Sequence, residues 1–132
     1  MLTFNYNDGG RSNYFKTADV RDCVTRSISI AAKQDYKEVY DLMSELMEHA
    51  TGSTNVEDGV LIGVYHITVI NHGFTWIEED IKFENLPTEG TLLIRVDSHL
   101  SCMIDGVIQD IFDPREELEE LKVKGYYFKP TE

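Results

Sequence analysis

Cysteine is scarce in this sequence, and long apolar runs are absent. The two cysteines, Cys23 and Cys102, are too few for a disulfide scaffold and indicate a reducing compartment. No apolar run approaches the roughly 20 residues that a membrane-spanning helix needs, and the first residues lack the basic start and apolar centre of a secretion signal. We therefore expect a cytoplasmic protein (in the host cytoplasm if a phage encodes it) that binds no membrane.

Basic residues are also few, with 12 Lys and Arg against 24 Asp and Glu, so the formal charge is −12. Nucleic-acid binding depends mainly on basic side chains that neutralise phosphates, and this balance argues against nucleic acid as a partner. The charge is uneven, because residues 1–34 hold a net +2 and the other 98 residues hold −14. The positive segment contains Cys23, and a nearby positive charge favours a thiolate over a thiol.

The 132 residues are 42% hydrophobic and 27% charged, which fits one ordered domain over residues 1–132. The first 18 residues are polar and aromatic and predict an irregular lead-in. Between Val20 and Ala31, apolar or small residues recur at helical spacing. Asp19 and Asp22 are both candidate caps for this helix, and either one places Cys23 within about its first turn.

A second helix is marked by a capping box of Asp35 and Glu38 and by the apolar stripe that follows it. The segment Thr51-Gly52-Ser53 ends this helix. Residues 60–72 are ambiguous, because their β-branched content favours a strand, whereas their length and the glycine that follows them fit a helix. Periodicity alone does not decide between the two.

The last third of the chain predicts an antiparallel β-meander. Asp105-Gly106 is the strongest short hairpin signal in the sequence, and Asp113-Pro114 has the pattern of a helix start. The expected elements are strands at 91–96, 99–104, 107–112 and 123–129 and a short helix to about residue 122. Since helices come first and the sheet follows, the predicted class is α+β, with N-terminal helices packed on a C-terminal antiparallel sheet.

The register of this hairpin brings a histidine and a carboxylate together. Alternation along the two strands places four side chains on one face: His99, Ser101, Asp110 and Phe112. Asp110 is then the diagonal neighbour of His99, within side-chain reach. We expect its carboxylate to hold the Nδ1–H of the imidazole, which leaves Nε2 to act on a nucleophile. Asp113 is the alternative acid; it has the opposite parity and can serve as an N-cap, but a one-residue slip would exchange the two.

Cys23 is the candidate nucleophile. A thiol near a helix N-terminus, flanked by Arg21 and Arg26, has three reasons for a lowered pKa. Together, Cys23, His99 and Asp110 match the roles of a thiol hydrolase. The structural alternative is that Cys23 is a small buried apolar residue and His99 a sheet histidine with satisfied hydrogen bonds.

The sequence indicates no metal or cofactor site. His49, His66 and His72 lack ligand spacing with any cysteine or carboxylate pair, and the glycines form no nucleotide-binding pattern. Cys102 has the opposite parity to His99 on its strand and is expected to pack in the core. We therefore expect chemistry that needs no cofactor.

The segments DCVTRSI and DYKEVY stand at positions 22–28 and 35–40. They resemble the D-C-x-x-R-A-I opening and the Y-x-E-V-Y helix of small phage and bacterial papain-like cysteine peptidase domains. The likeness covers residues 19–128 in consistent order. It continues through positions 59–60, 73–76, 86–91, 95–100, 104–108, 110–113 and 125–127.

This resemblance implies a papain-like fold, in which the nucleophile helix packs against an antiparallel sheet that presents the histidine. It carries Cys23 over as the nucleophile, His99 as the general base and Asp110 as the orienting acid. It also favours a helix over residues 60–72.

Thr17 marks a departure from the related bacteriocin-processing peptidases. TADVRDC at positions 17–23 is similar to their Q-x-D-x-x-D-C motif, but Thr17 stands where they have the oxyanion-hole glutamine. A threonine hydroxyl reaches less far than a glutamine amide. The candidate oxyanion donors are therefore Thr17 or Asn13, beside the backbone N–H of Cys23.

These observations predict a thiol hydrolase that cleaves an amide or isopeptide bond in a protein or peptide substrate. One alternative is a catalytically degenerate papain-like binding or regulatory protein, and Thr17 favours it. A second is an acidic inhibitor of a host or partner enzyme that mimics nucleic acid. The net positive charge of residues 1–34 speaks against that mimic.

Overall fold

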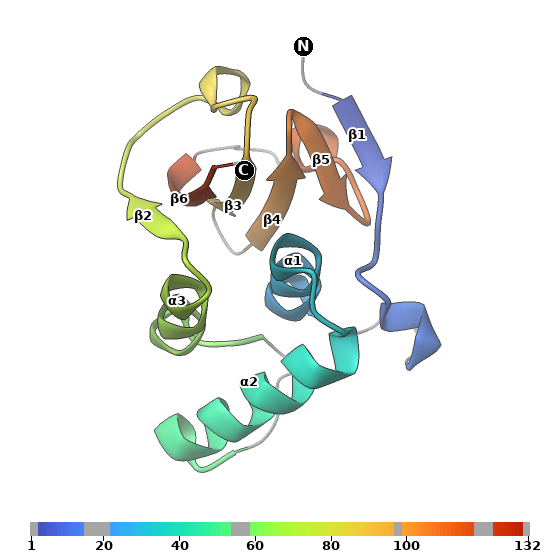
Figure 1. The fold of residues 1–132 in the computed structure, drawn as a ribbon, viewed down its shortest axis with the longest axis vertical. Coiled ribbons are helices and arrows are strands. Elements are labelled where there is room, and N and C mark those ends of the chain that lie inside the picture. Colours follow the sequence, from blue (N-terminus) through green and yellow to red (C-terminus); the bar gives the residue numbers. More distant parts are fainter. Residues whose placement is uncertain (1–2, 15–21, 54–58, 97–98, 118–122, 131–132) are drawn as a thin grey trace.

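The computed structural model describes residues 3–14, 22–53, 59–96, 99–117 and 123–130 (Figure 1). The first half of the chain is mainly helical and the second half mainly strand. In chain order the elements are β1 (Thr3–Tyr6), η1 (Arg11–Asn13), α1 (Cys23–Ala32), α2 (Tyr36–Thr51), α3 (Ile62–Asn71), β2 (Thr75–Ile77), η2 (Phe83–Asn85), β3 (Thr91–Val96), β4 (His99–Ile104), β5 (Val107–Asp110), α4 (Pro114–Glu117) and β6 (Val123–Lys129).

The strands form one six-stranded sheet in the order β1-β5-β4-β3-β6-β2. The α+β class is confirmed, and the four C-terminal strands pair antiparallel as predicted. The meander order is wrong, because β6 pairs with β3 rather than with β5, and the whole sheet is mixed, because β1 runs parallel to β5. The polar lead-in contains β1, whose four side chains are all exposed, so no apolar alternation marked it as a strand. β1 pairs with residues more than 100 positions away in the sequence, and no local sequence pattern predicts such a pairing.

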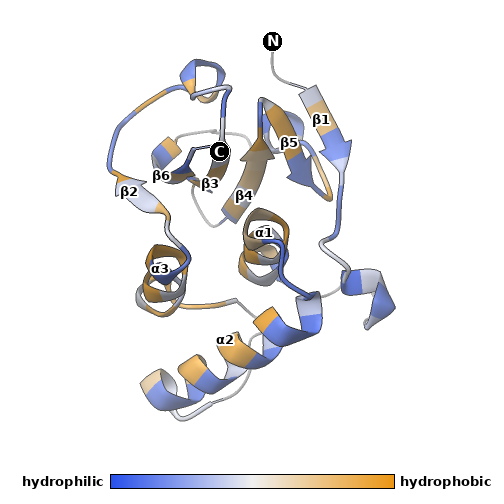
Figure 2. Cartoon of the chain, viewed as in Figure 1, coloured by the Kyte–Doolittle hydropathy of each residue, from blue (hydrophilic) through white to orange (hydrophobic). Residues whose placement is uncertain are grey.

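Three helices cover one face of the sheet. Helix α1 packs on β4, α2 packs on α1, and α3 packs on α2. Figure 2 shows apolar residues on the sides of α1 and α2 that face their neighbours. One buried cluster fills this layer, and its largest contributors are Val24, Ile28, Met43, Val69, Leu93, Leu100 and Tyr127. A second cluster covers the opposite face and includes Phe83, Leu86, Leu92, Ile94, Met103 and Ile108.

The helix predictions are confirmed where a cap marked them. The Asp35 side chain accepts a hydrogen bond from the backbone N–H of Glu38, as the capping box requires, and α2 begins at the next residue after Asp35. Gly52 ends α2 with a φ of 81°. Residues 60–72 contain a helix, α3, which buries four side chains: Val64, Tyr65, Thr68 and Val69. Tertiary packing therefore overrides the β-propensity of this segment.

The strand predictions hold closely for β3, β4 and β6. β5 ends at Asp110, two residues earlier than expected. Helix α4 covers Pro114–Glu117, and the rest of the predicted helix to residue 122 lies outside the described residues. No helix in the described part of the chain has the length and apolarity that crossing a membrane requires.

Candidate active site

The thiol of Cys23 lies where α1 meets β4. Cys23 is the first residue of α1, and its neighbour Asp22 occupies the N-cap position. Because α1 packs on β4, the thiol reaches the start of that strand. The His99 imidazole and the backbone N–H of Leu100 lie close enough to the thiol to lower its pKa. Cys23 is half-buried.

His99 in turn contacts Asp110 across the hairpin. Its Nε2 lies 2.7 Å from Asp110 Oδ2, and the two side chains are only 7% and 2% exposed. The expected partnership is therefore present, but the predicted nitrogen is wrong. Nε2 faces the carboxylate, and this leaves Nδ1 for Cys23. Strand register places a ring next to a carboxylate, but it does not determine how the ring is rotated.

The carboxylate of Asp110 is saturated with donors. Besides His99, it accepts from the Ser101 hydroxyl at 2.7 Å, from the backbone N–H of Ile111 at 2.8 Å and from Arg26 Nη1 at 2.9 Å. Ser101 was expected on this face, and its contact follows from the hairpin register. The role of Arg26 was missed, because the sequence connects it only to Cys23, three residues earlier in the chain.

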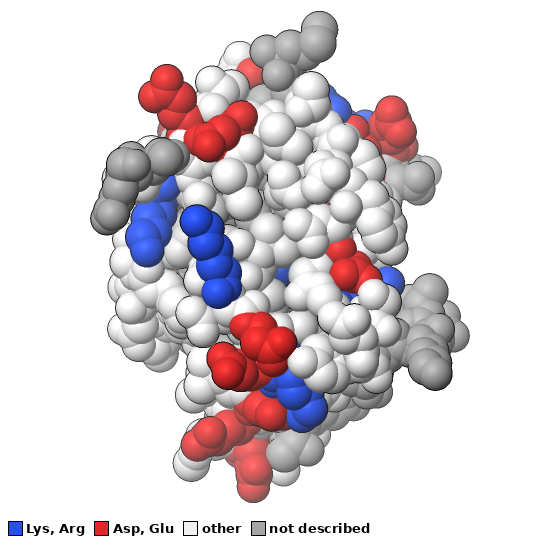
Figure 3. All heavy atoms as spheres, turned by 45° about the vertical axis from the view of Figure 1, so that its right-hand side comes forward, with Lys and Arg blue, Asp and Glu red and all other residues white. Residues whose placement is uncertain are grey.

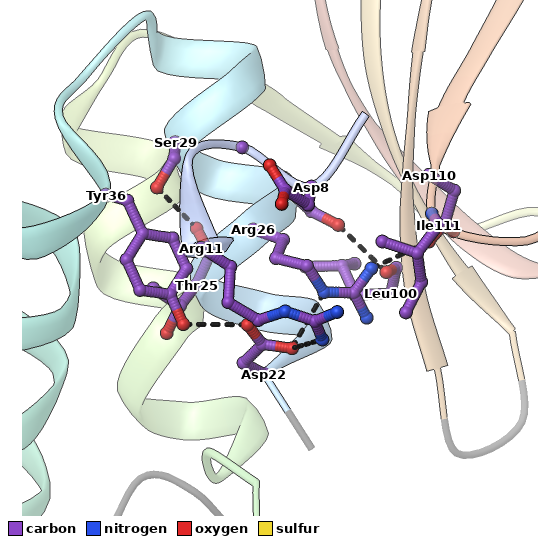
Figure 4. A network of polar contacts seen from close by, with 12 residues as sticks. Asp8, Arg11, Asp22, Thr25, Arg26, Ser29, Tyr36, Leu100, Asp110 and Ile111 are labelled. Carbon is purple, nitrogen blue, oxygen red and sulfur yellow. Dashed lines mark hydrogen bonds and ion pairs between the residues drawn. The ribbon is translucent and has the colours of Figure 1, made fainter. Parts of the chain in front are cut away.

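Arg26 joins the carboxylates of Asp110 and Asp22 in a buried ion-pair network (Figure 4). Asp22 Oδ1 lies 2.8 Å from Arg26 Nε and 3.3 Å from Arg11 Nη1, and Asp22 Oδ2 accepts from the Tyr36 hydroxyl at 2.7 Å. The proposed capping role of the Asp22 side chain is therefore wrong, since it makes no cap hydrogen bond. The other candidate cap, at position 19, lies outside the described residues.

Two basic residues of the N-terminal segment are internal. Arg11 and Arg26 are buried and paired with acids, so they do not form a positive surface around Cys23. Arg21 lies outside the described residues. Arg26 still lowers the pKa of the thiol through its charge, as one of several contributions.

The pKa values of the thiol and the imidazole move in opposite directions. Burial raises the pKa of Cys23, but the hydrogen bond and charge of His99, the Leu100 N–H and Arg26 outweigh it, so the net shift is downward. Burial lowers the pKa of His99, but Asp110 and Cys23 raise it to about 9. The pKa of Asp110 is lowered, because its donors and the charges of His99 and Arg26 outweigh burial. Together these shifts favour a thiolate–imidazolium pair.

A cavity of about 440 Å³ opens beside the thiol. Its walls are mostly apolar, with two cations, Arg95 and Lys124. The described residues that line it are Cys23, Val24, Gly59, Val60, Ile62, Tyr65, Arg95, Val96, His99, Leu100 and Lys124. A neighbouring cavity of about 340 Å³ shares Arg95 and Lys124 and is lined also by Glu78, Glu79, Asp80 and Val123.

The structure does not place Asp113 or Asn13 beside the Cys23 thiol. Asp113 pairs with Arg115, with Oδ2 at 2.7 Å from Nη2. Asn13 is exposed in η1 and is not among the described lining residues, and Thr17 lies outside the described part of the chain. Cys102 is fully buried, as expected, and both cysteines are free.

Metal-ligating side chains do not gather anywhere in the described structure. No group of three His, Cys, Asp or Glu residues within the described ranges is arranged to hold an ion.

The chain matches no family model, no curated protein and no solved structure.

Proposed function

We propose that this protein is a papain-like thiol hydrolase that cleaves an amide or isopeptide bond in a protein or peptide substrate. The observation that carries the proposal is the chain of contacts from the Cys23 thiol through His99 to Asp110. The thiol, the base and the acid come from three different elements, and the thiol and the base line one cavity. Both cysteines are free, which fits action in the cytoplasm.

The geometry supports a two-step reaction. The Cys23 thiolate attacks the carbonyl carbon, and the carbonyl π electrons move to the oxygen. His99 then gives its proton to the leaving amine as the C–N bond breaks, which leaves a thioester on Cys23. In the second step His99 takes a proton from water as the water oxygen attacks the thioester carbonyl carbon. The C–S bond then breaks, the product carboxylic acid is released, and Cys23 leaves as a thiolate beside the protonated His99.

Residues around the triad support these steps. The backbone N–H of Cys23 lies in the first turn of α1, where amides have no intrahelical acceptor, so it is available to the developing oxyanion. Asp110 fixes the rotation of the His99 ring and stabilises the imidazolium. Arg26 and Ser101 hold the Asp110 carboxylate in place.

A second function, binding without turnover, is favoured by the composition of the cavity wall. The described lining residues contain no Ser, Thr, Asn or Gln that would serve as a side-chain oxyanion donor. A degenerate member of this class would hold a peptide beside Cys23 and release it uncleaved.

The acidic-inhibitor alternative has little support on the surface. On the face drawn in Figure 3, acidic side chains form separate groups with uncharged surface and basic residues between them. A mimic of nucleic acid needs a continuous acidic surface on the face that its target binds.

Turnover of a defined peptide library tests the proposal. The full chain is incubated with the library, and the products are identified by mass spectrometry. We expect new cleavage products that disappear for Cys23→Ala and for His99→Ala, while Cys102→Ala retains them. If Cys23→Ala retains library peptides and the unmodified protein cleaves none, the hydrolase proposal is wrong and the protein binds peptides without cleaving them.

A further inference from the structure

Arg95 faces the cavity that contains the nucleophile. It lies in β3, directly opposite Leu100 of β4 and Gly125 of β6. The backbone N–H of Leu100 lies close enough to the Cys23 thiol to lower its pKa, so Arg95 belongs to the strand next to the candidate nucleophile. It lines both the thiol cavity and the neighbouring one.

The guanidinium of Arg95 is held in place by aromatic side chains. It lies over the ring of Trp76, 4.8 Å from the ring centroid. It also lies close enough to Tyr65 to oppose the rise that burial causes in the pKa of that hydroxyl. The Trp76 ring packs against Tyr127 at a centroid distance of 4.7 Å. It also lies across Gly125, where an added Cβ would clash with the ring. The position of Arg95 is therefore supported by several packed groups rather than by a flexible contact.

Arg95 has no acidic partner in the described structure. Arg11, Arg26 and Arg115 each form an ion pair with an aspartate. No carboxylate of the described residues lies within 4.0 Å of Arg95, which is half-buried. The described lining of the thiol cavity contains no acid at all. A half-buried, preorganised guanidinium without a counter-ion is suited to bind a carboxylate, to which it can donate two parallel hydrogen bonds.

We propose that Arg95 binds a carboxylate of the substrate next to the bond that Cys23 attacks, and so selects acidic substrates. This inference rests on the proposed hydrolase function. The carboxylate is either an acidic side chain or the C-terminus of the substrate chain. The negative charge of the whole protein favours the opposite, basic, substrates. Glu78, Glu79 and Asp80 line the neighbouring cavity together with Arg95, but none of them forms an ion pair with it.

Two alkylating reagents of nearly equal size test the charge preference directly. Iodoacetate carries a carboxylate and iodoacetamide does not, so the ratio of their rates at Cys23 reports the local attraction for a carboxylate. We expect Arg95→Gln to lower this ratio by about three- to tenfold at low ionic strength, with the iodoacetamide rate changed less than twofold. Arg95→Lys retains a cation and should keep most of the ratio.

Lys33→Asn is the matched control. It also removes one positive charge, but Lys33 follows the C-terminal end of α1, about 15 Å along the helix from Cys23, and Asn tolerates its left-handed backbone. The ratio should stay unchanged in this variant. An unchanged ratio in Arg95→Gln, or an equal loss in Lys33→Asn, would overturn the inference.

Protection experiments separate the two sources of the carboxylate. Short peptides compete with iodoacetamide for the site: one with an internal Glu and an amidated end, one with Gln in its place, and one with Ala throughout and a free C-terminus. Protection by the Glu peptide identifies an acidic side chain, and protection by the free C-terminus identifies the chain end. If no peptide protects, or if the Gln peptide protects as well as the others, Arg95 does not select a carboxylate. A slow iodoacetamide reaction that does not depend on His99 would instead refute the hydrolase proposal. The ratio of the iodoacetate and iodoacetamide rates could still be measured in that case and would still test the role of Arg95.

Discussion

His99 Nε2 lies 2.7 Å from Asp110 Oδ2, so the other ring nitrogen is the one available to Cys23. A carboxylate at Nε2 places the proton of the neutral ring there and leaves the lone pair of Nδ1 directed at the thiol. The two nitrogens thus exchange the roles that the strand register alone suggests. The proposed triad tolerates this exchange, because it needs only one ring nitrogen for the acid and the other for the nucleophile.

The alkylation rate of Cys23 should depend on pH as expected for an ion pair. The pKa of the thiol is lowered and that of His99 is raised to about 9, so the thiolate forms at a lower pH than in a free cysteine and keeps its imidazolium partner up to about pH 9. We expect the iodoacetamide rate to rise with a midpoint below the free-cysteine value of about 8.5. His99→Ala should move that midpoint upward. A single midpoint near 8.5 in both proteins would contradict the thiolate–imidazolium pair.

Replacement of the acid distinguishes Asp110 from Asp113. Asp110→Asn removes the negative charge that raises the pKa of His99, so the thiolate loses part of its support. We expect the alkylation rate at about pH 6 to fall about tenfold, the effect of a one-unit rise in the thiol pKa. Asp113→Asn, whose carboxylate pairs with Arg115, should stay within twofold. Equal losses in both variants would mean that Asp110 has no special role.

The buried pairs of Arg26 should matter for stability far more than an exposed pair does. Arg26→Met leaves Asp22 and Asp110 buried and short of a cation, and we expect the free energy of unfolding to fall by about 3–5 kcal/mol. Arg115→Met breaks a pair whose arginine side chain is 34% exposed, compared with 5% for Arg26, and should change it by about 0–1 kcal/mol. Urea denaturation of the three proteins gives the comparison. Similar losses for both variants would show that the buried network adds little.

Thr25 offers a stabilising substitution. Its Oγ1 is buried and has no hydrogen-bond partner among the described residues. Thr25→Val keeps the shape and removes the unpaired hydroxyl, so we expect a gain of about 0.5–1 kcal/mol in unfolding free energy. Ser27→Ala is the control, because the Ser27 hydroxyl donates to the Leu100 carbonyl at 2.9 Å and its loss should destabilise by about 1 kcal/mol. Destabilisation by Thr25→Val would indicate a partner for this hydroxyl.

Local patterns predicted the elements that carry the site. Asp105 and Gly106 adopt positive φ values of 49° and 81°, as a type I′ hairpin turn requires. The predicted register followed from that turn, with Ile104 opposite Val107. Because side chains alternate along paired strands, the contact between His99 and Asp110 was predictable from the sequence alone.

The contacts that the sequence did not predict join segments that are distant in the chain. The parallel pairing of β1 with β5 joins the two ends of the sequence, and the exposed side chains of β1 give no periodic signal. The link from Arg26 to Asp110 depends on how α1 sits on the sheet. The position of Arg95 over Trp76 likewise requires β2 and β3 to be placed first. Sequence spacing describes none of these three relationships.

Most of the chain separates Cys23 from His99 and Asp110, and this affects how the protein is made. During synthesis, α1 with its thiol emerges well before the hairpin that supplies the base and the acid. Without those partners a cysteine has its ordinary pKa of about 8.5 and is mainly an unreactive thiol at neutral pH. In the proposed enzyme, Cys23 therefore stays unreactive while the chain is synthesised, and it becomes a nucleophile only when the last strands complete the sheet.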